Sequence, residues 1–265
     1  MKGRRTHPAR MIDIHTHILP GLDDGAASLS EAVEMVRIAA RTGTTDLVVT
    51  PHANFEYEFE PAVARERLAE LEFAAGPGVR LHWGCDFHLS AHNIEDALAH
   101  PAKYTINGKR YLLVEFPDVL IAATTTRDFA RLLEAGMVPI ITHPERNFLL
   151  HARMEDLKHW AGLGCLVQVT AQSFTNRFGK QVRAFARALL EQRLVHFVAS
   201  DAHDAHDRTP RLDQAYREVT ERAGGQRAEL LFVTNPGAVL TGAPLPEPGP
   251  EEPRPARKWF HFRGC

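Results

Sequence analysis

The feature that most constrains the fold is a regular alternation of short apolar segments with longer amphipathic ones. Candidate strands such as 46–50 (DLVVT) and 138–142 (VPIIT) are rich in β-branched residues and almost wholly apolar, as expected of strands covered on both faces. Between them lie segments such as 29–42, where apolar residues recur with the period of a helix. The strand-helix unit repeats seven times along the chain, which predicts parallel strands joined by crossover helices.

Seven such units suit a single-domain α/β barrel better than an open sheet or two small domains. We assign residues 11–242 to this barrel, residues 1–10 to an N-terminal tail and residues 243–265 to a C-terminal tail that is rich in proline. The chain contains no GxGxxG fingerprint, so a dinucleotide site is not expected. Asn107-Gly108 predicts a β-hairpin between segments 104–106 and 110–112.

The cysteine and charge content exclude several protein classes. Cys85, Cys165 and Cys265 are too far apart in sequence for a CxxC zinc site or a disulfide framework, which fits a reducing compartment. No apolar run reaches the ~18 residues of a membrane helix, and the basic N-terminus lacks the apolar stretch of a signal peptide. A net charge of −2 argues against a dedicated nucleic-acid binder. We therefore expect a cytoplasmic protein without membrane insertion; the sequence leaves its oligomeric state open.

Histidines and acidic residues follow the predicted strands at the point where each strand ends. The chain has 15 histidines, and in a parallel barrel functional groups gather at the carboxyl ends of the strands. Six of the seven strands deliver such a residue there, whereas the sixth ends in the polar but poorly ligating Gln168-Val169-Thr170. The residues concerned are His15, His17, His52, Asp86, Glu115, His143, Asp201 and His203.

The spacing of these residues points to metal binding. In the extended segments His15-Thr16-His17 and Asp201-Ala202-His203 the two outer side chains point the same way and can meet one cation. Imidazole and carboxylate without thiolate suit Mn, Fe or Zn. A single catalytic zinc needs only three protein ligands. The candidates exceed that number, so two or three divalent ions are expected.

Four motifs, in this order, resemble those of one family: DIHTHILPGLDDG, TPH, THPERN and SDAHD. They are similar to the polymerase-and-histidinol-phosphatase metal-dependent hydrolases, and more narrowly to the bacterial manganese-dependent protein-tyrosine phosphatases of capsule and exopolysaccharide operons. HxH alone is shared by many hydrolases. The LDDG box with Asp24, the arginine that follows His143 by three residues, and SDxH followed by Arg208 are more specific.

The resemblance implies a distorted (β/α)7 TIM-like barrel and a site with three metals, manganese first. His15, His17 and Asp201 would hold the first ion, and Glu115 and His143 would complete the second. Asp24, His52 and His203 would hold the third ion, and Arg146 and Arg208 would grip phosphate. One position departs from the family, because Asp86 stands where a glutamate usually bridges the first two ions. A shorter side chain there puts metal affinity and rate in question.

The expected function is hydrolysis of phosphomonoesters, above all of phosphotyrosine in a protein such as a bacterial tyrosine autokinase. The expected mechanism is attack of a metal-bridging hydroxide on phosphorus. Arg146 and Arg208 would stabilise the charged oxygens, and Asp201 or His203 would supply any proton needed by the leaving group. Two alternatives stay open: a small-molecule phosphatase such as histidinol phosphatase, and a metal-bound regulatory module with little catalysis.

Aromatic residues near the strand ends are a further candidate feature. Phe55, Tyr57 and Phe59 follow His52, and Phe148, Phe174 and Phe178 lie after the fifth and sixth strands. Each could stack on a substrate ring or belong to the core. The sequence does not choose between these roles.

Overall fold

The computed structural model describes residues 10–246. Almost all of the N-terminal tail predicted at 1–10, and the C-terminal tail from residue 247 onward, lie outside the described residues. Residues 243–246 are described and belong to no helix or strand. The described part is a single α/β domain in which strands and helices alternate as the sequence predicts.

The strands form two parallel sheets. One sheet has the order β1-β2-β4 and the other β3-β5-β6-β7-β8-β9, and every strand pair among the described residues is parallel. The strands are β1 (Met11–Thr16), β2 (Thr44–Val49), β3 (His52–Ala53), β4 (Arg80–Trp83), β5 (Asp86–His88), β6 (Tyr111–Glu115), β7 (Val138–Thr142), β8 (Leu166–Thr170) and β9 (Phe197–Ala199).

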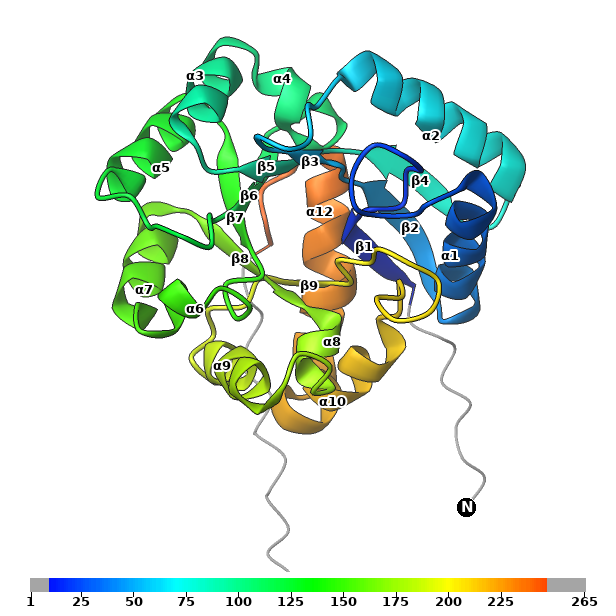
Figure 1. Cartoon of the computed structure of the whole chain (residues 1–265). Coiled ribbons are helices and arrows are strands. Elements are labelled where there is room, and N and C mark those ends of the chain that lie inside the picture. Colours follow the sequence, from blue (N-terminus) through cyan, green and yellow to red (C-terminus); the bar gives the residue numbers. More distant parts are fainter. Residues whose placement is uncertain (1–9, 247–265) are drawn as a thin grey trace, which may run out of the picture.

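Helices surround the strands on the outside, except for the last one, which lies across the middle of the view in Figure 1. They are α1 (Leu29–Arg41), α2 (Pro61–Ala75), α3 (Ala91–Ala99), α4 (Pro101–Tyr104), α5 (Thr125–Glu134), α6 (Phe148–His151), α7 (Met154–Leu163), α8 (Ala171–Phe174), α9 (Lys180–Glu191), α10 (Asp213–Ala223), α11 (Gly225–Glu229) and α12 (Asn235–Thr241). A 3-10 turn (Ile106–Gly108) precedes β6, and a π-helical segment (Leu230–Thr234) joins α11 to α12.

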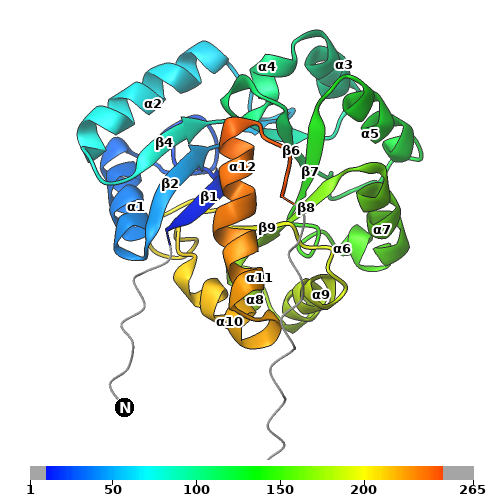
Figure 2. The ribbon, with the colours of Figure 1, turned by 180° about the vertical axis from the view of Figure 1, so that it is seen from behind.

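The core has an inner and an outer part. The outer part, between strands and helices, is the larger cluster and includes Leu47, Phe87 and Val167. The inner part lies among inward-facing strand residues such as Ile14 and Leu113. Val239 of α12 belongs to this inner cluster, and Figure 2 shows α12 crossing the molecule in front of the strands. Helix α12 therefore covers the amino-terminal ends of the strands and leaves the carboxyl ends for the loops that follow them.

The described residues form nine strands where the sequence predicts seven, because after each of two predicted strands there is an interruption and then a short additional strand. β3 follows the predicted strand 46–50 after Pro51, and β5 follows the predicted strand 79–85, which is observed as β4, after Gly84 and Cys85. A Cβ on Gly84 would lie 3.1 Å from both Val48 Cγ1 and Ile106 Cγ1, so a side chain here would make these two neighbours shift by a few tenths of an ångström. Both interruptions move the following residue, His52 or Asp86, into the second sheet.

The hairpin predicted around Asn107-Gly108 is wrong. Both residues have the positive φ values that the sequence suggests, 53° and 64°. The segment before the turn is helical (α4), however, and β6 pairs in parallel with β5 and β7 rather than with its own preceding segment. The sequence correctly predicts a turn with positive φ at Asn107 and Gly108, but burial between two parallel neighbours determines which strands pair with β6.

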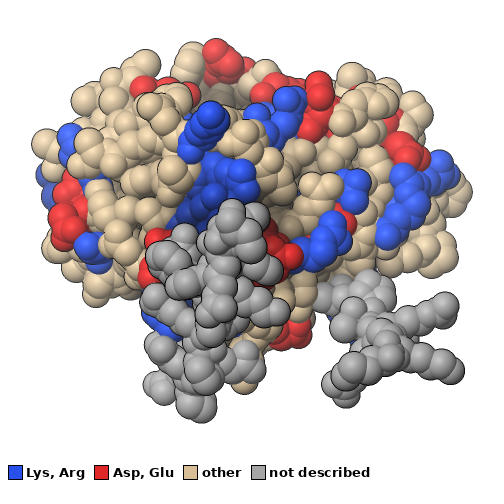
Figure 3. Space-filling view, turned by 90° about the horizontal axis from the view of Figure 1, so that it is seen from below, with Lys and Arg blue, Asp and Glu red and all other residues tan. Residues whose placement is uncertain are grey.

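No helix in the described part of the chain is long and apolar enough to cross a membrane. On the face drawn in Figure 3, basic and acidic side chains are intermingled rather than separated into one uniform patch. Elsewhere in the described residues acidic and basic side chains also pair: Glu218 of α10 binds Arg187 of α9 at 2.5 Å and Arg222 at 2.6 Å. The face in Figure 3 lacks the uniformly basic surface that is typical of nucleic-acid binders.

The structure predicts an acid-sensitive contact before β9, remote from the carboxyl ends of the strands. His196 Nδ1 accepts a hydrogen bond from the Val167 N–H at 3.1 Å. Burial, and then the charge of Arg227, lower the pKa of His196 from 6.5 to about 4. Between these two values the unfolded chain binds a proton that the folded chain does not, so stability falls as the pH falls through this window.

When the pH is lowered from 7 to 5, the free energy of unfolding of the native chain should fall by about 1 to 2 kcal/mol more than that of His196→Asn. Urea unfolding in the presence of chelator at several pH values measures this difference. The exposed His159 provides a matched control, and His159→Asn should follow the native chain. Parallel stability curves for His196→Asn and the native chain would contradict the prediction.

Candidate metal centre

The structure brings all nine candidate metal-binding residues together at the carboxyl ends of the strands. His15 lies in β1, His52 begins β3, Asp86 begins β5 and Glu115 ends β6. The others lie in the segments that follow strands: His17, Asp24, His143, Asp201 and His203. They form four overlapping groups whose ligand atoms lie within 4.8 Å of one another. The groups are His17, Asp24, His52 and His203; His15, His17 and Asp86; His15, His143 and Asp201; and His52, Asp86 and Glu115.

The rings of His15 and His17 are oriented by residues that the sequence analysis did not select. His15 Nδ1 lies 2.9 Å from Gln168 Oε1, and His17 Nδ1 lies 2.8 Å from Asp23 Oδ2. With a cation bound, each Nδ1 can donate to its oxygen acceptor while each Nε2 faces the interior of the cluster. The two Nε2 atoms are 3.1 Å apart, close enough for both to bind one cation.

Asp86 is the carboxylate at the centre of the cluster. Its Oδ2 lies 3.4 Å from His15 Nε2, 4.0 Å from His17 Nε2 and 3.3 Å from His52 Nδ1. Its side chain is fully buried, yet neither oxygen has a hydrogen-bond partner among the described residues. A buried carboxylate without partners is costly unless a cation binds it. The side chains present therefore fit a metal at this point.

The electrostatics of the cluster favour cations. Burial lowers the pKa of His15, but the charges of Asp86 and Asp201 outweigh it and raise this pKa to about 9. Burial also opposes a proton on His52, and the nearby carboxylates of Asp24 and Asp86 nevertheless raise its pKa to about 11. The negative field that favours protons on these rings also favours divalent metal ions.

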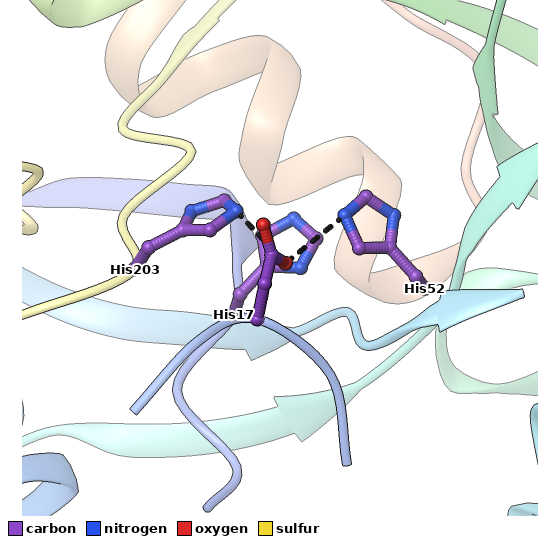
Figure 4. A group of neighbouring side chains, drawn as sticks. His17, His52 and His203 are labelled. Carbon is purple, nitrogen blue, oxygen red and sulfur yellow. Dashed lines mark ion pairs between the residues drawn. The ribbon is translucent and has the colours of Figure 1, made fainter. Parts of the chain in front are cut away.

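Asp24 forms the open side of the cluster. Its Oδ1 lies 3.4 Å from His52 Nε2 and 3.4 Å from His203 Nε2. Figure 4 shows the imidazoles of His17, His52 and His203 around this carboxylate. The bonds to His203 and His52 hold the pKa of Asp24 well below its usual range. The Asp24 side chain is 49% exposed, so a ligand from solvent could approach from this side.

The loop that carries Asp24 is shaped by its neighbours. Asp23 is buried and accepts bonds from the His52 N–H at 3.1 Å and the Gly25 N–H at 3.0 Å, besides its contact with His17. A Cβ on Gly25 would lie 1.9 Å from the His17 carbonyl oxygen, so only glycine fits there. Adjacent aspartates thus have different tasks: Asp23 holds two imidazole-bearing segments, and Asp24 faces the opening.

Asp201 connects the cluster to the two candidate phosphate-binding arginines. Its Oδ1 lies 3.6 Å from His15 Nε2 and 3.4 Å from His17 Nε2. Its Oδ2 accepts from Arg208 Nη2 at 2.7 Å and from Arg146 Nη1. Both arginines therefore end next to the cluster, as the sequence analysis expected.

Two candidate ligands have a backbone conformation that is unusual for residues other than glycine. His143 has a φ of 32° and Asp201 a φ of 50°. Hydrogen bonds hold both positions, from the Arg146 N–H to the His143 carbonyl and from the Asp201 N–H to the His15 carbonyl, each 2.9 Å long. Strained residues of this kind concentrate at functional sites.

Several further residues near the cluster have roles that the sequence left open. His88 does not join any of the groups; its Nδ1 lies 3.8 Å from Glu115 Oε2. Phe59 and Phe174 are buried in the core, whereas Phe55 and Phe148 are largely exposed. Tyr57 stacks on His52 with ring centroids 6.0 Å apart. Phe178 packs on Arg146, with the guanidinium carbon 4.6 Å from the ring centroid.

The residues that the sequence analysis missed are Asp23, Gln168 and the buried Glu145. Asp23 adjoins Asp24, Gln168 is the polar residue of the sixth predicted strand, and Glu145 lies between His143 and Arg146. Each was therefore next to a motif or at a strand end, but none is a usual direct ligand in that context. Their partners, which come from distant segments, became visible only in the fold.

Comparison with known proteins places this centre in a family. The chain is 34% identical over 256 residues to tyrosine-protein phosphatase YwqE of Bacillus subtilis, a match that covers 95% of this chain and all of the relative. It is 30% identical over 240 residues to tyrosine-protein phosphatase CpsB of Streptococcus pneumoniae, covering 87% of this chain and 98% of the relative.

A solved structure from a study of YwqE from Bacillus subtilis and CpsB from Streptococcus pneumoniae, described as unique metal-dependent tyrosine phosphatases, matches with a TM-score of 0.83 at 32% identity. The match covers 92% of this chain and 100% of that one. The family model described as capsular polysaccharide synthesis, CpsB/CapC, matches residues 11–241. The chain therefore belongs to the CpsB/CapC family of capsular polysaccharide synthesis.

Proposed function

We propose that this chain is a metal-dependent protein-tyrosine phosphatase. One observation carries the proposal. The carboxylate of Asp201 belongs to one of the four overlapping groups of candidate ligands and also binds two arginines, Arg146 and Arg208. The relatives named tyrosine-protein phosphatases span almost the whole chain and support the same activity. The substrate is then a phosphotyrosine protein. We propose that this protein is a tyrosine autokinase and that the reaction takes place in the cytoplasm.

We assign the candidate ligands to two or three divalent ions, with manganese as the first choice and iron or zinc as alternatives. His15, His17 and Asp201 would hold the first ion, and Asp86 would lie between the first and the second. Glu115 and His143 would complete the second ion; their closest approach, between Oε1 and Nε2, is 3.5 Å. Asp24, His52 and His203 would hold the third ion. The overlap of the four groups, in which Asp86 belongs to two, supports sharing of ligands.

When bound, the metal ions would supply Lewis-acid activation of water and of the phosphoryl oxygens. The chain itself binds and orients the substrate. Arg146 and Arg208 are positioned by Asp201 so that their remaining N–H groups can donate to phosphate oxygens, and guanidinium groups match phosphate in geometry and charge. A tyrosyl oxygen, with a pKa of ~10 as a free phenol, needs little protonation to leave. Asp201 and His203, which the sequence suggests as proton donors, are here assigned to metal ions, so this scheme takes no proton from them.

We further propose that the two sheets together form one distorted (β/α)7 barrel within residues 11–242. A parallel bridge joins Thr16 to Ala202, and the His17 N–H donates to the Ala202 carbonyl at 2.8 Å. The Gly84 N–H donates to the Val49 carbonyl at 2.9 Å and the Asp86 N–H to the Pro51 carbonyl at 3.0 Å, so the pairing of β2 with β4 continues into that of β3 with β5 at the other junction of the sheets. These contacts support a continuous ring of strands, in which candidate ligands from distant segments face one centre.

Kinetics on two classes of substrate test the proposed function. In manganese, kcat/KM should be highest for a phosphotyrosine peptide and at least about tenfold lower for histidinol phosphate, because the exposed rim around Asp24 can accept a polypeptide. The reverse order would favour the small-molecule phosphatase. No turnover of any substrate despite bound metal would favour a regulatory module.

Metal removal and thiol alkylation should have opposite effects. Chelation should lower the hydrolysis of a phosphotyrosine peptide by at least about 100-fold. Alkylation should leave the rate within about twofold, because the described cysteines, Cys85 and Cys165, are buried and burial raises the pKa of both thiols. Adding manganese back is the control. Full activity in protein shown by elemental analysis to be metal-free would refute this mechanism.

Asp86→Asn should reduce the number of bound metal ions by at least one and lower kcat/KM by at least about 100-fold, because Asp86 belongs to two candidate groups. Elemental analysis and phosphotyrosine kinetics provide the measurements. His88→Asn, two residues along the same strand and outside the groups, is the matched control and should retain its metals. Unchanged metal content in Asp86→Asn would contradict the assignment.

Asp86→Glu tests whether the shorter residue is a handicap. Asp86 is fully buried and already reaches three imidazoles within 4.0 Å. An extra methylene in a filled site forces neighbours to move, so we expect kcat/KM to fall by about tenfold. A gain in activity would show that the centre is better served by the glutamate usual in the family.

Arg146→Met and Arg208→Met should each raise KM and lower kcat/KM for a phosphotyrosine peptide by about 10- to 1000-fold, because a charged donor to the phosphate is lost. Metal content should be unchanged. Arg153→Met, at an exposed arginine that pairs with Asp156, is the matched control. A wild-type KM in both arginine variants would exclude them as phosphate ligands.

A further inference from the structure

Glu145 is a buried acid that the proposed metal centre does not use. It lies between His143 and Arg146, its side chain is inaccessible to solvent, and it belongs to none of the candidate metal groups. Its Oε1 accepts from the Thr170 N–H at 2.9 Å and from the Ser173 hydroxyl at 2.7 Å. Burying a carboxylate is costly, so its two bonds to the end of β8 and to α8 call for a purpose.

The segment that Glu145 holds contacts Arg146. Residues 171–178 comprise α8 and a turn closed by the bond from the Arg177 N–H to the Gln172 carbonyl, 3.2 Å long. The turn ends at Phe178, whose ring packs against the Arg146 guanidinium at 4.6 Å. Glu145 therefore anchors the start of segment 171–178. The end of the same segment, at Phe178, supports Arg146, the residue next to Glu145 in the chain.

The same segment contacts the loop that carries the other arginine. Gln172 Nε2 donates to the Asp207 carbonyl at 2.9 Å, and Arg177 pairs with the Asp207 carboxylate at 3.2 Å. Asp207 precedes Arg208 in the chain. Segment 171–178 thus lies between the loops that carry the two arginines and contacts both.

We propose that Glu145 is a positioning residue, which fixes segment 171–178 so that Phe178 holds the Arg146 guanidinium in place for phosphate. An arginine that is already ordered loses less side-chain entropy when an anion binds. A cation packed on an aromatic face also keeps its N–H edge free for other acceptors. The inference rests on the proposed function in one respect, that Arg146 binds the phosphate.

The test measures binding of inorganic phosphate to the manganese-loaded full-length chain by titration calorimetry, with KM, kcat and metal content determined alongside. Phe178→Leu should weaken phosphate binding and raise KM by about fivefold to tenfold, with kcat and metal content unchanged. This side chain is partly exposed, so its replacement leaves the fold intact. Phosphate binding equal to that of the native chain would overturn the proposal.

Glu145 itself is tested with Glu145→Ala and its conservative counterpart. Glu145→Ala should weaken phosphate binding by about tenfold, and Glu145→Gln, which keeps an oxygen acceptor for Thr170 and Ser173, should restore most of the affinity. In a Phe178→Leu background, Glu145→Ala should add less than about twofold, because both residues act through the same contact. Additive losses, or a loss of metal in Glu145→Gln, would show a merely structural role.

The outcomes also separate this inference from the proposed function. If the native chain binds phosphate through Arg146 but hydrolyses no phosphotyrosine, the proposed function fails and the positioning role stands. If Arg146→Met binds phosphate as the native chain does, the positioning role fails, whatever the activity.

Discussion

The arrangement of the candidate centre depends on one buried carboxylate, that of Asp86. Its Oδ2 faces imidazole nitrogens from three different segments of the chain, and neither of its oxygens is otherwise bonded among the described residues. A charge of this kind is unfavourable in a protein interior unless cations balance it. The fold therefore buries negative charge that a metal ion would stabilise, and the surrounding residues hold the Asp86 carboxylate and the imidazoles in position.

Two kinds of support maintain the cluster. Asp23 and Gln168 orient the rings of His17 and His15 from behind, so that their free nitrogens converge. The backbone contributes as well, because Gly25 allows the loop to pass against the His17 carbonyl and positive φ values direct His143 and Asp201 inward. Rigid strands with tightly held loops are a suitable frame for a candidate metal centre of fixed geometry.

Arg146 and Arg208 add positive charge beside the cluster of candidate metal ligands. Asp201 shares its two oxygens between the imidazoles and the guanidinium groups, so one carboxylate links the candidate metal ligands to the candidate phosphate-binding arginines. In the proposed phosphatase this coupling places positive charge on both sides of a phosphate ester. The buried Glu145 extends the same arrangement to segment 171–178 and to Phe178.

The sequence by itself determined the parallel α/β architecture, the order of its units and the residues that lie at the strand ends. It could do so because period and burial leave a direct trace in the chain, and because parallel strands all end at one edge. It did not determine that β6 would follow a helical turn rather than a hairpin, since Asn107-Gly108 carries only local information. The tertiary structure alone decided that Asp23, Gln168 and Glu145 have partners in distant segments. Those choices depend on contacts between residues far apart in the chain, for which no local pattern exists.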